Sequence, residues 1–167
     1  MNQGSNTEDR AAIHDVLMRY FRGADRTDAD LIRDCFHPDA EIDFGEFFKG
    51  DLPAFVEYLP GPTGWGAFAR TMHVTGNELI EVDGTTARAE TYCVAYHEPP
   101  AEPGEAPPIM IVWLRYLDRF ERRQGEWRIL RRRTAVEWVR QDDAGGWQEL
   151  PGEMRGVRGP DDPVFEI

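Results

Sequence analysis

The sequence predicts an α+β fold, in which N-terminal helices pack inside a strongly curved, mostly antiparallel sheet. Apolar residues recur at intervals of three and four over residues 8–24, which is typical of an amphipathic helix. From residue 71 to 138, strand-like alternation and turn signals dominate instead. Helical and strand segments are therefore separated along the chain, as in α+β domains. A curved sheet closing over helices leaves a conical interior where small molecules commonly bind.

The first helix is expected over residues 8–24. Its apolar side chains fall on one face, namely those of Ile13, Val16, Leu17, Tyr20, Phe21 and Ala24. Ser5 and Glu8 have the spacing of a capping box that would start this helix, and Gly23 would loosen its end. Asp28 has the position of an N-cap for a second, short helix, which the sequence His37-Pro38-Asp39 would stop.

The middle of the chain predicts less regular structure. Residues 40–47 (AEIDFGEF) alternate and indicate a short strand. The Pro- and Gly-rich residues 50–66 are expected to form a mobile cap that contains one or two helical turns. We expect one domain at residues 1–140, followed by an irregular or loosely docked tail at residues 141–167.

Two long hairpins are expected to form most of the sheet. The first surrounds Asp83-Gly84, a strong turn signal, and the second surrounds Gln124-Gly125. A Pro-rich loop at residues 98–108 connects the two hairpins. Their strands are expected at residues 71–82, 86–97, 109–122 and 127–138.

The composition disfavours some classes of binding partner. The net charge is −12, with 31 acidic against 19 basic residues, which disfavours nucleic acid and anionic membranes. Many arginines lie between Arg115 and Arg140, and we interpret them as a solvated sheet face. No apolar run approaches the roughly 18–20 residues that cross a bilayer, and no secretion signal opens the chain. A cytoplasmic location and a small-molecule partner are the expectations.

The sequence lacks the residues or motifs that several classes of enzyme require. Ser5 is the only serine, which argues against a Ser-His-Asp hydrolase, and the GxGxxG, P-loop and HExxH motifs are absent. Cys35 is interpreted as a small buried apolar residue, and with Cys93 it provides no disulfide framework. The four histidines are scattered in sequence, so no metal ligand set is indicated, although three of them could still converge in space.

Acid–base chemistry by His, Asp and Tyr remains. Asp25 is expected just beyond the helix that carries Tyr20, and His73 falls early in a strand. By alternation, the residues on the face of His73 would be Thr75, Asn77 and Leu79. A carboxylate bound to one imidazole nitrogen fixes the tautomer and leaves the other nitrogen free to accept a proton. From spacing alone, Asp25 as a loop cap, His73 as a sheet residue and Tyr20 as a core aromatic stay open as alternatives.

Three stretches resemble SnoaL-like proteins of the nuclear transport factor 2-like superfamily. The first is residues 11–43, with Tyr20, Asp25 and the F-H-P-D-A sequence. The second is the first hairpin, with His73, Asn77 and the DG turn. The third is DRFERRQGEWRILRRR at residues 118–133. The resemblance covers about residues 8–138 and implies a cone-shaped α+β barrel.

The resemblance also implies site residues. Asp25 and His73 are similar to the acid–base dyad of scytalone dehydratase, bile acid 7α-dehydratase and hexachlorocyclohexane dehydrochlorinase, which are cofactor-free lyases. Tyr20 matches a tyrosine that the dehydratases place near the reacting oxygen, and His97 falls near a second histidine of scytalone dehydratase. One of Arg131, Arg132 and Arg133 is similar to a terminal-strand arginine found in some members. Alternation places Arg132 on the face opposite its two neighbours, so Arg132 and the other pair cannot both point inward, and we favour Arg132.

The expected activity is elimination or isomerisation of a small, apolar, cyclic substrate without cofactor or metal. Two alternatives remain: a non-catalytic ligand-binding protein, or the small β-subunit of an aromatic-ring-hydroxylating dioxygenase. A homodimer or homotrimer is expected to form through the open sheet face at residues 109–120. The pocket is expected to be lined by Phe21, Phe44, Phe55, Tyr58, Trp65, Phe68, Val94 and Trp113.

Overall fold

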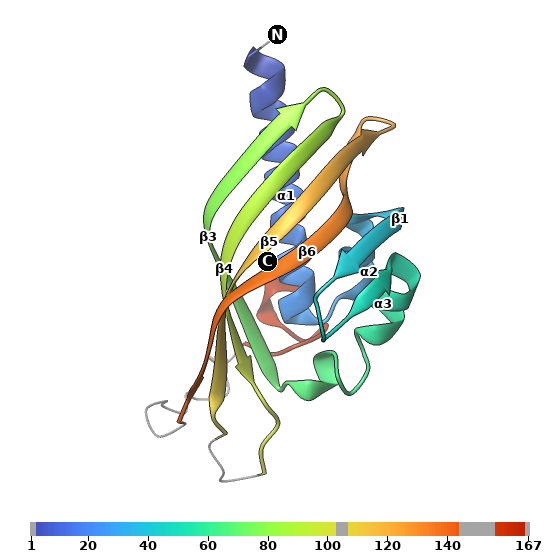
Figure 1. Cartoon of the computed structure of the whole chain (residues 1–167). Coiled ribbons are helices and arrows are strands. Elements are labelled where there is room, and N and C mark those ends of the chain that lie inside the picture. Colours follow the sequence, from blue (N-terminus) through green and yellow to red (C-terminus); the bar gives the residue numbers. More distant parts are fainter. Residues whose placement is uncertain (1–2, 103–106, 144–155, 166–167) are drawn as a thin grey trace.

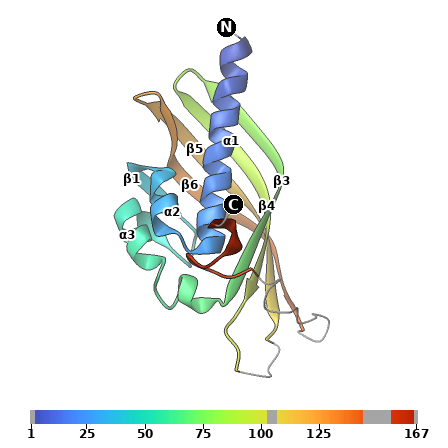
Figure 2. The same cartoon turned by 180° about the vertical axis from the view of Figure 1, so that it is seen from behind.

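A six-stranded, strongly curved sheet wraps around one long helix in the computed structural model, which describes residues 3–102, 107–143 and 156–165 (Figures 1 and 2). The strand order is β2-β1-β6-β5-β4-β3. β1 and β6 are parallel, and the other neighbouring strands are antiparallel. The α+β class with a mostly antiparallel sheet is thus confirmed. The sheet stays open, because β2 and β3 form its two edges.

The long helix α1 (Gln3–Arg26) lies on the concave face of the sheet, as Figure 2 shows. It starts at Gln3, so Ser5 lies within the helix and the expected capping box at Ser5 and Glu8 is wrong. The helix ends where Thr27 adopts a positive φ of 56°. Asp25 therefore lies in the last turn of α1 rather than beyond it, and helical hydrogen bonding fixes its backbone.

Gly23 serves packing rather than helix termination. A Cβ at this position would lie 2.8 Å from Ile32 Cγ1, so only glycine lets α2 (Ala29–Asp34) approach α1 this closely. Asp28 caps α2 as predicted, since its side chain accepts a hydrogen bond from the Leu31 amide at 2.9 Å. The close approach of the two helices fixes the direction in which the chain leaves α1.

Two helical segments follow within the region expected to be a cap. The first is α3 (Leu52–Tyr58), capped by Asp51, and the second is the 3-10 helix η1 (Trp65–Ala67). A further 3-10 helix, η4 (Pro163–Phe165), lies near the end of the chain. In the part of the chain that the structure describes, no helix combines the length and apolar character required to cross a bilayer.

Both predicted hairpins are confirmed, and their strands are longer than expected. The short strand begins earlier than predicted, so the sequence His37-Pro38-Asp39 belongs to a strand and does not merely stop α2. The turns use Gly84 (φ 61°) and the pair Gln124 and Gly125 (φ 54° and 89°), where the left-handed conformation suits tight hairpins. The strands are β1 (Phe36–Asp43), β2 (Lys49–Asp51), β3 (Arg70–Asp83), β4 (Thr86–Glu98), β5 (Ile109–Arg123) and β6 (Glu126–Asp142).

A bulge in β3 changes which side chains face the interior. The pairing register with β4 shifts between Thr75 and Glu78. An extra residue in a strand reverses the alternation beyond it. Leu79 is therefore 56% exposed, whereas Ile80 is buried at 6%. The expectation that Leu79 shares the face of His73 is wrong for this reason.

The core lies between α1 and the concave face of the sheet. Small side chains on the inner face of β4, those of Ala87, Ala89 and Ala95, are buried and leave room for larger groups from α1. Aromatic rings fill that room, and Tyr20 packs edge to face against Phe21 with their centroids 5.5 Å apart. The interior is thus lined mainly by aromatic side chains.

The described end of the tail, residues 156–165, lies beside the C-terminal end of α1 (Figure 2). Asp162 is buried and pairs with Arg26, with Nε and Oδ2 3.3 Å apart. The Gly159 amide donates to the Arg26 carbonyl at 3.0 Å. Specific contacts thus hold this part of the tail against the end of α1. The rest of the expected tail beyond Asp143 lies outside the described residues.

Candidate active site

Asp25 and His73 meet at the end of α1. Asp25 Oδ1 lies 2.7 Å from His73 Nδ1, and Asp25 Oδ2 accepts the backbone N–H of His73 at 3.0 Å. Thr71 Oγ1 donates to Asp25 Oδ1, also at 3.0 Å. The carboxylate therefore holds both the ring and the backbone of β3. The side chains of His73 and Asp25 are only 10% and 14% exposed.

The environment keeps Asp25 ionised. Burial alone would raise the pKa of this carboxyl group, but the hydrogen bonds and positive charge of His73 outweigh burial and hold the pKa below its usual range. An ionised carboxylate only accepts hydrogen bonds. His73 Nδ1 must then be the donor in their contact, which leaves Nε2 of a neutral ring with a free lone pair.

His97 extends this site from β4. Its ring lies 5.8 Å from the His73 ring, nearly perpendicular to it, and 4.6 Å from the Phe68 ring. Its Nδ1 atom is buried and has no hydrogen-bond partner among the described residues. Burial, with the nearby His73, lowers the pKa of His97 to about 4. His97 is therefore neutral at physiological pH, in contrast to a surface histidine.

Arg132 forms a second, separate polar cluster. Its Nε and Nη2 atoms bind the two carboxylate oxygens of Asp118 at 2.8 and 2.7 Å, and both side chains are fully buried. Its guanidinium carbon lies 3.9 Å from the Tyr20 ring centroid and 4.6 Å from that of Tyr116. Burial disfavours the charged form, but Asp118 outweighs burial and raises the pKa of Arg132.

Phe21 connects the two polar clusters. Its ring stacks on His73 with centroids 5.9 Å apart, and it meets Tyr116 edge-on at 5.2 Å. The structure thus brings Asp25, His73 and His97 together. Tyr20 and Arg132 belong to the second cluster, which Phe21 contacts through the rings of Tyr20 and Tyr116.

Most of the residues expected to line a pocket lie near the interior. Phe44 contacts both Phe55 and Tyr116, with centroids 5.4 and 6.4 Å apart. Tyr58 and Trp65 are partly buried at the edge of the core, where Tyr58 packs against Phe48. These rings extend the aromatic lining from Phe21 towards α3.

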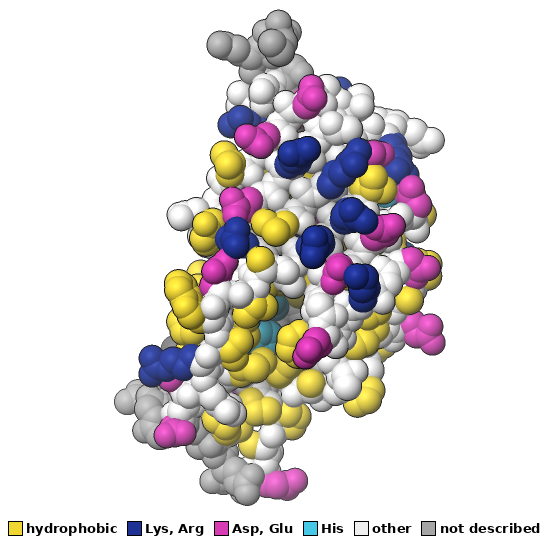
Figure 3. Space-filling model, viewed as in Figure 1, with side chains coloured by type: hydrophobic (Ala, Val, Ile, Leu, Met, Phe, Trp, Pro, Cys, Tyr) yellow, Lys and Arg dark blue, Asp and Glu magenta, His cyan; other side chains and the backbone are white. Residues whose placement is uncertain are grey.

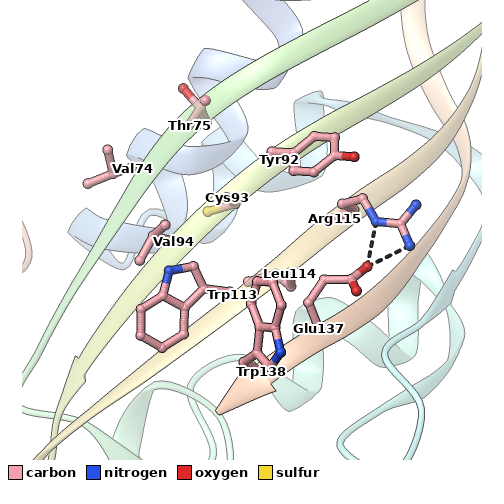
Figure 4. A pocket seen from close by; sticks show the side chains of 11 residues that line it. Val74, Thr75, Tyr92, Cys93, Val94, Trp113, Leu114, Arg115, Glu137 and Trp138 are labelled. Atoms are coloured by element: carbon pink, nitrogen blue, oxygen red, sulfur yellow. Dashed lines mark hydrogen bonds and ion pairs between the residues drawn. The ribbon is translucent and has the colours of Figure 1, made fainter. Parts of the chain in front are cut away.

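Val94 and Trp113 require a correction, because they lie on the outer face of the sheet. Their neighbours along the strands, including Cys93 and Leu114, are buried on the inner side, and alternation turns Val94 and Trp113 outward. They line a hollow of about 600 Å³ on the outer face, next to Trp138 (Figure 4). They cannot share a cavity with His73.

A model of the SnoaL-like domain matches residues 5–133 of the chain. The chain belongs to the SnoaL-like family. Among its relatives is the uncharacterized protein Rv2910c of Mycobacterium tuberculosis, which is 31% identical over 126 residues, covering 74% of this chain and 82% of that protein. The family resemblance inferred from the sequence motifs is confirmed.

Solved structures place this SnoaL-like protein among known folds. A hexachlorocyclohexane dehydrochlorinase, LinA type 2, has a TM-score of 0.77 at 18% identity, covering 92% of this chain and all of that one. A scytalone dehydratase-like protein of Novosphingobium aromaticivorans has a TM-score of 0.73 at 22% identity, covering 89% and 100%. At these identities the likeness establishes the shared cone-shaped fold alone.

Sequence reasoning missed three contributors to the site of the SnoaL-like chain. Thr71 binds Asp25, and its position two residues before His73 on a strand was an available signal. Asp118 pairs with Arg132 across two strands, which only the register of β5 and β6 reveals. Arg158 donates hydrogen bonds to the carbonyl oxygens of Ala24 and Phe68 beside the site. It lies beyond the matched domain, and no sequence pattern pointed to it. Within the described residues, no group of three or more His, Cys, Asp or Glu side chains has an arrangement suited to a metal ion.

Proposed function

We propose that this SnoaL-like protein is a cofactor-independent lyase or isomerase of small, apolar, cyclic molecules. One observation carries the proposal: the 2.7 Å contact between an ionised Asp25 and His73 in a shielded, aromatic interior. That contact leaves His73 Nε2 as a proton acceptor in a site largely protected from water. The named activities of the two structural neighbours, dehydrochlorination and dehydration, are eliminations and agree with it.

In the proposed reaction, His73 Nε2 removes a proton from a substrate carbon. The electron pair of that C–H bond forms a carbon–carbon double bond, and hydroxide or halide leaves with the electrons of its own bond. The proton on His73 then passes to the departing hydroxide or to solvent. Asp25 remains ionised and stabilises the imidazolium. Proton transfer of this kind contributes roughly 10²–10⁴-fold in rate.

Isomerisation would use the same proton acceptor. The proton on His73 then returns to a different carbon of the substrate, and no group leaves. The choice between the two outcomes depends on whether the substrate carries a leaving group next to the acidic carbon.

Supporting roles follow from charge and protonation. Burial raises the pKa of Tyr20, so its hydroxyl stays protonated and can donate to a substrate oxygen. Arg132 has one nitrogen, Nη1, that is buried without a hydrogen-bond partner among the described residues, and it can attract developing negative charge. His97 is neutral and presents Nδ1 as a further polar contact beside His73.

The substrate is expected to be apolar because aromatic side chains surround the polar groups. Such a lining removes water from the base and favours compact rings over extended polar chains. The side chains that we assign to it are those of Phe21, Phe44, Phe55, Tyr58, Trp65 and Phe68.

The test combines elimination assays with matched variants. The purified protein is incubated with hexachlorocyclohexane and with cyclic β-hydroxy ketones, and halide release or enone absorbance is followed. His73→Ala and Asp25→Asn are expected to lower turnover at least about 100-fold. His14→Ala is the control, because His14 lies on another part of α1, is half exposed and pairs with Glu78 of β3. Turnover at the full rate by His73→Ala would refute the assignment.

We also propose self-association as a homodimer or homotrimer through the outer sheet face. Figure 3 shows hydrophobic side chains over the lower part of this face and basic side chains, interspersed with acidic ones, over the upper part. Trp138 and Val74 are exposed there and line the hollow of Figure 4. Light scattering should give two or three chains per particle, and Trp138→Glu should shift the particles towards monomers. A native monomer at micromolar concentration would refute this.

The same outer face supports a second candidate function, in which the protein braces a larger enzyme as a small subunit. Its broad apolar surface could hold a metal-containing α-subunit, as in ring-hydroxylating dioxygenases. Expression beside such a subunit, followed by purification, would separate the two candidates. A stable complex whose activity is unchanged by His73→Ala favours the bracing role.

A further inference from the structure

A single arginine near the end of the chain contacts both sides of the Asp25–His73 site. Arg158 Nη1 donates to the carbonyl oxygens of Phe68 and Trp65 at 2.8 and 3.1 Å. Its Nη2 donates to the carbonyl oxygen of Ala24 at 3.4 Å. One planar guanidinium thus joins the last turn of α1 to the loop that precedes β3.

The residues held by Arg158 are the neighbours of site residues. Ala24 directly precedes Asp25 in α1, and the Phe68 ring packs on His97. The loop runs on into β3, whose Thr71 and His73 bind the Asp25 carboxylate. A change in the distance between α1 and this loop would therefore alter the Asp25–His73 contact itself.

The segment around Arg158 is ordered by contacts that do not involve its side chain. Asp162 accepts the backbone N–H groups of Val157 and Val164, both at 3.0 Å, and pairs with Arg26. Gly159, with a φ of 87°, donates its amide to the Arg26 carbonyl. These contacts should keep the segment in place when the Arg158 side chain is changed.

The charge of Arg158 also acts on the site. Burial lowers the pKa of Arg158, and the Asp25 carboxylate partly offsets that effect by favouring the charged guanidinium. The interaction is reciprocal, so the guanidinium favours the ionised form of Asp25.

We propose that Arg158 is a positioning residue, which sets the geometry and charge of the Asp25–His73 site by tying α1 to the loop before β3. The effect of Arg158 on catalysis rests on the proposed function, whereas its effect on the structure and charge of the site does not. The matched family domain ends at residue 133, so this role would be supplied by a part of the chain outside that domain.

The test compares two substitutions with a control. Arg158→Gln removes the charge and most of the bridge, whereas Arg158→Lys keeps the charge without the planar fork. Arg10→Gln is the control, because Arg10 is exposed and lies 15 residues before Asp25 on α1, about 22 Å away. The readouts are the carbon-13 NMR titration of the Asp25 carboxyl group and amide hydrogen exchange at residues 22–26 and 65–72.

Arg158→Gln is expected to raise the pKa of Asp25 and to accelerate exchange in both segments at least about tenfold. Arg158→Lys is expected to preserve the pKa but not the slow exchange. Arg10→Gln should change neither. If Arg158→Gln leaves both the titration and the exchange as in the native protein, the proposal is wrong.

Where a substrate has been found, kcat adds a third readout. Arg158→Gln should lower kcat about tenfold or more with little change in KM, since misplacing a base affects the chemical step. Suppose that Arg158→Gln raises the pKa of Asp25, but the native protein turns over none of the substrates. That result would support the positioning role and count against the lyase assignment. The two proposals can therefore fail separately.

Discussion

Replacing Asp25 by Asn should reverse the tautomer of His73. In the native protein, Oδ1 faces the ring nitrogen and Oδ2 faces the backbone N–H of His73. If the NH₂ group of the asparagine faced that backbone N–H, two hydrogen-bond donors would oppose each other. The side-chain oxygen must therefore face the backbone, and the NH₂ group must face His73 Nδ1. The ring then accepts at Nδ1 and carries its proton on Nε2, where it can no longer act as the base.

The size of this effect follows from the contact that is lost. A hydrogen bond to a charged partner contributes about 1.5–3 kcal/mol, and 1.4 kcal/mol corresponds to a tenfold ratio. The native carboxylate should thus favour the Nδ1–H tautomer by roughly ten- to a hundredfold. In the variant the preference should favour Nε2–H, and turnover should fall by about 10³–10⁴, the scale of a wrong tautomer in an acid–base triad.

Nitrogen-15 NMR of the imidazole measures the tautomer directly, at a pH where the ring is neutral, and requires no substrate. Asp30→Asn serves as the control, since Asp30 is exposed and pairs with Arg33 within α2. Native and Asp25→Asn proteins with the same tautomer of His73 would refute the reasoning.

Two further predictions concern buried groups. Because unfolding returns the pKa of His97 from about 4 towards 6.5, the free energy of unfolding should drop by about 2 kcal/mol between pH 7 and 5, and His97→Gln should remove most of that drop in urea titrations. An equal slope in both proteins would contradict it. Asp118→Asn leaves Arg132 buried without its counter-ion and should cost about 3–5 kcal/mol, whereas Glu41→Gln, which breaks the exposed pair with Arg131, should cost less than about 1 kcal/mol. Similar costs for the two variants would show that the Arg132 pair is not buried.

Local pattern predicted the elements of this fold well, because periodicity and turn chemistry act over short distances. The helical face of α1, the cap at Asp28 and the hairpin turn at Asp83-Gly84 all follow from neighbouring residues. The bulge after Thr75 could not be predicted in this way. Its extra residue is set by pairing with β4, so the sequence alone left Leu79 on the wrong face.

The site shows the same limit at longer range. Asp25 and His73 could be paired from residue chemistry and family resemblance, but the third donor, Thr71, and the bridge from Arg158 depend on how distant segments meet. The prediction that Val94 lines the pocket was wrong, because it required knowing how the faces of β3 and β4 are related, and the sequence does not show this register. Contacts separated by many residues require the register of the sheet and the path of the tail.

Among the ionic pairs of the described residues, Arg132–Asp118 and Asp25–His73 differ in ways that indicate which of the two can move a proton. Arg132 and Asp118 are fully buried, bind each other in two places, and keep the arginine charged because its pKa is raised. A guanidinium in that state cannot exchange protons near neutral pH. His73 can, since Asp25 binds its ring through Nδ1 and leaves Nε2 available to accept a proton. The Arg132 pair is therefore suited to fixed electrostatic stabilisation, and the Asp25–His73 pair to proton transfer. Both would act on one substrate only if it reaches both ends of the contacts made by the Phe21 ring, which packs on His73 of one pair and on Tyr116 beside the other.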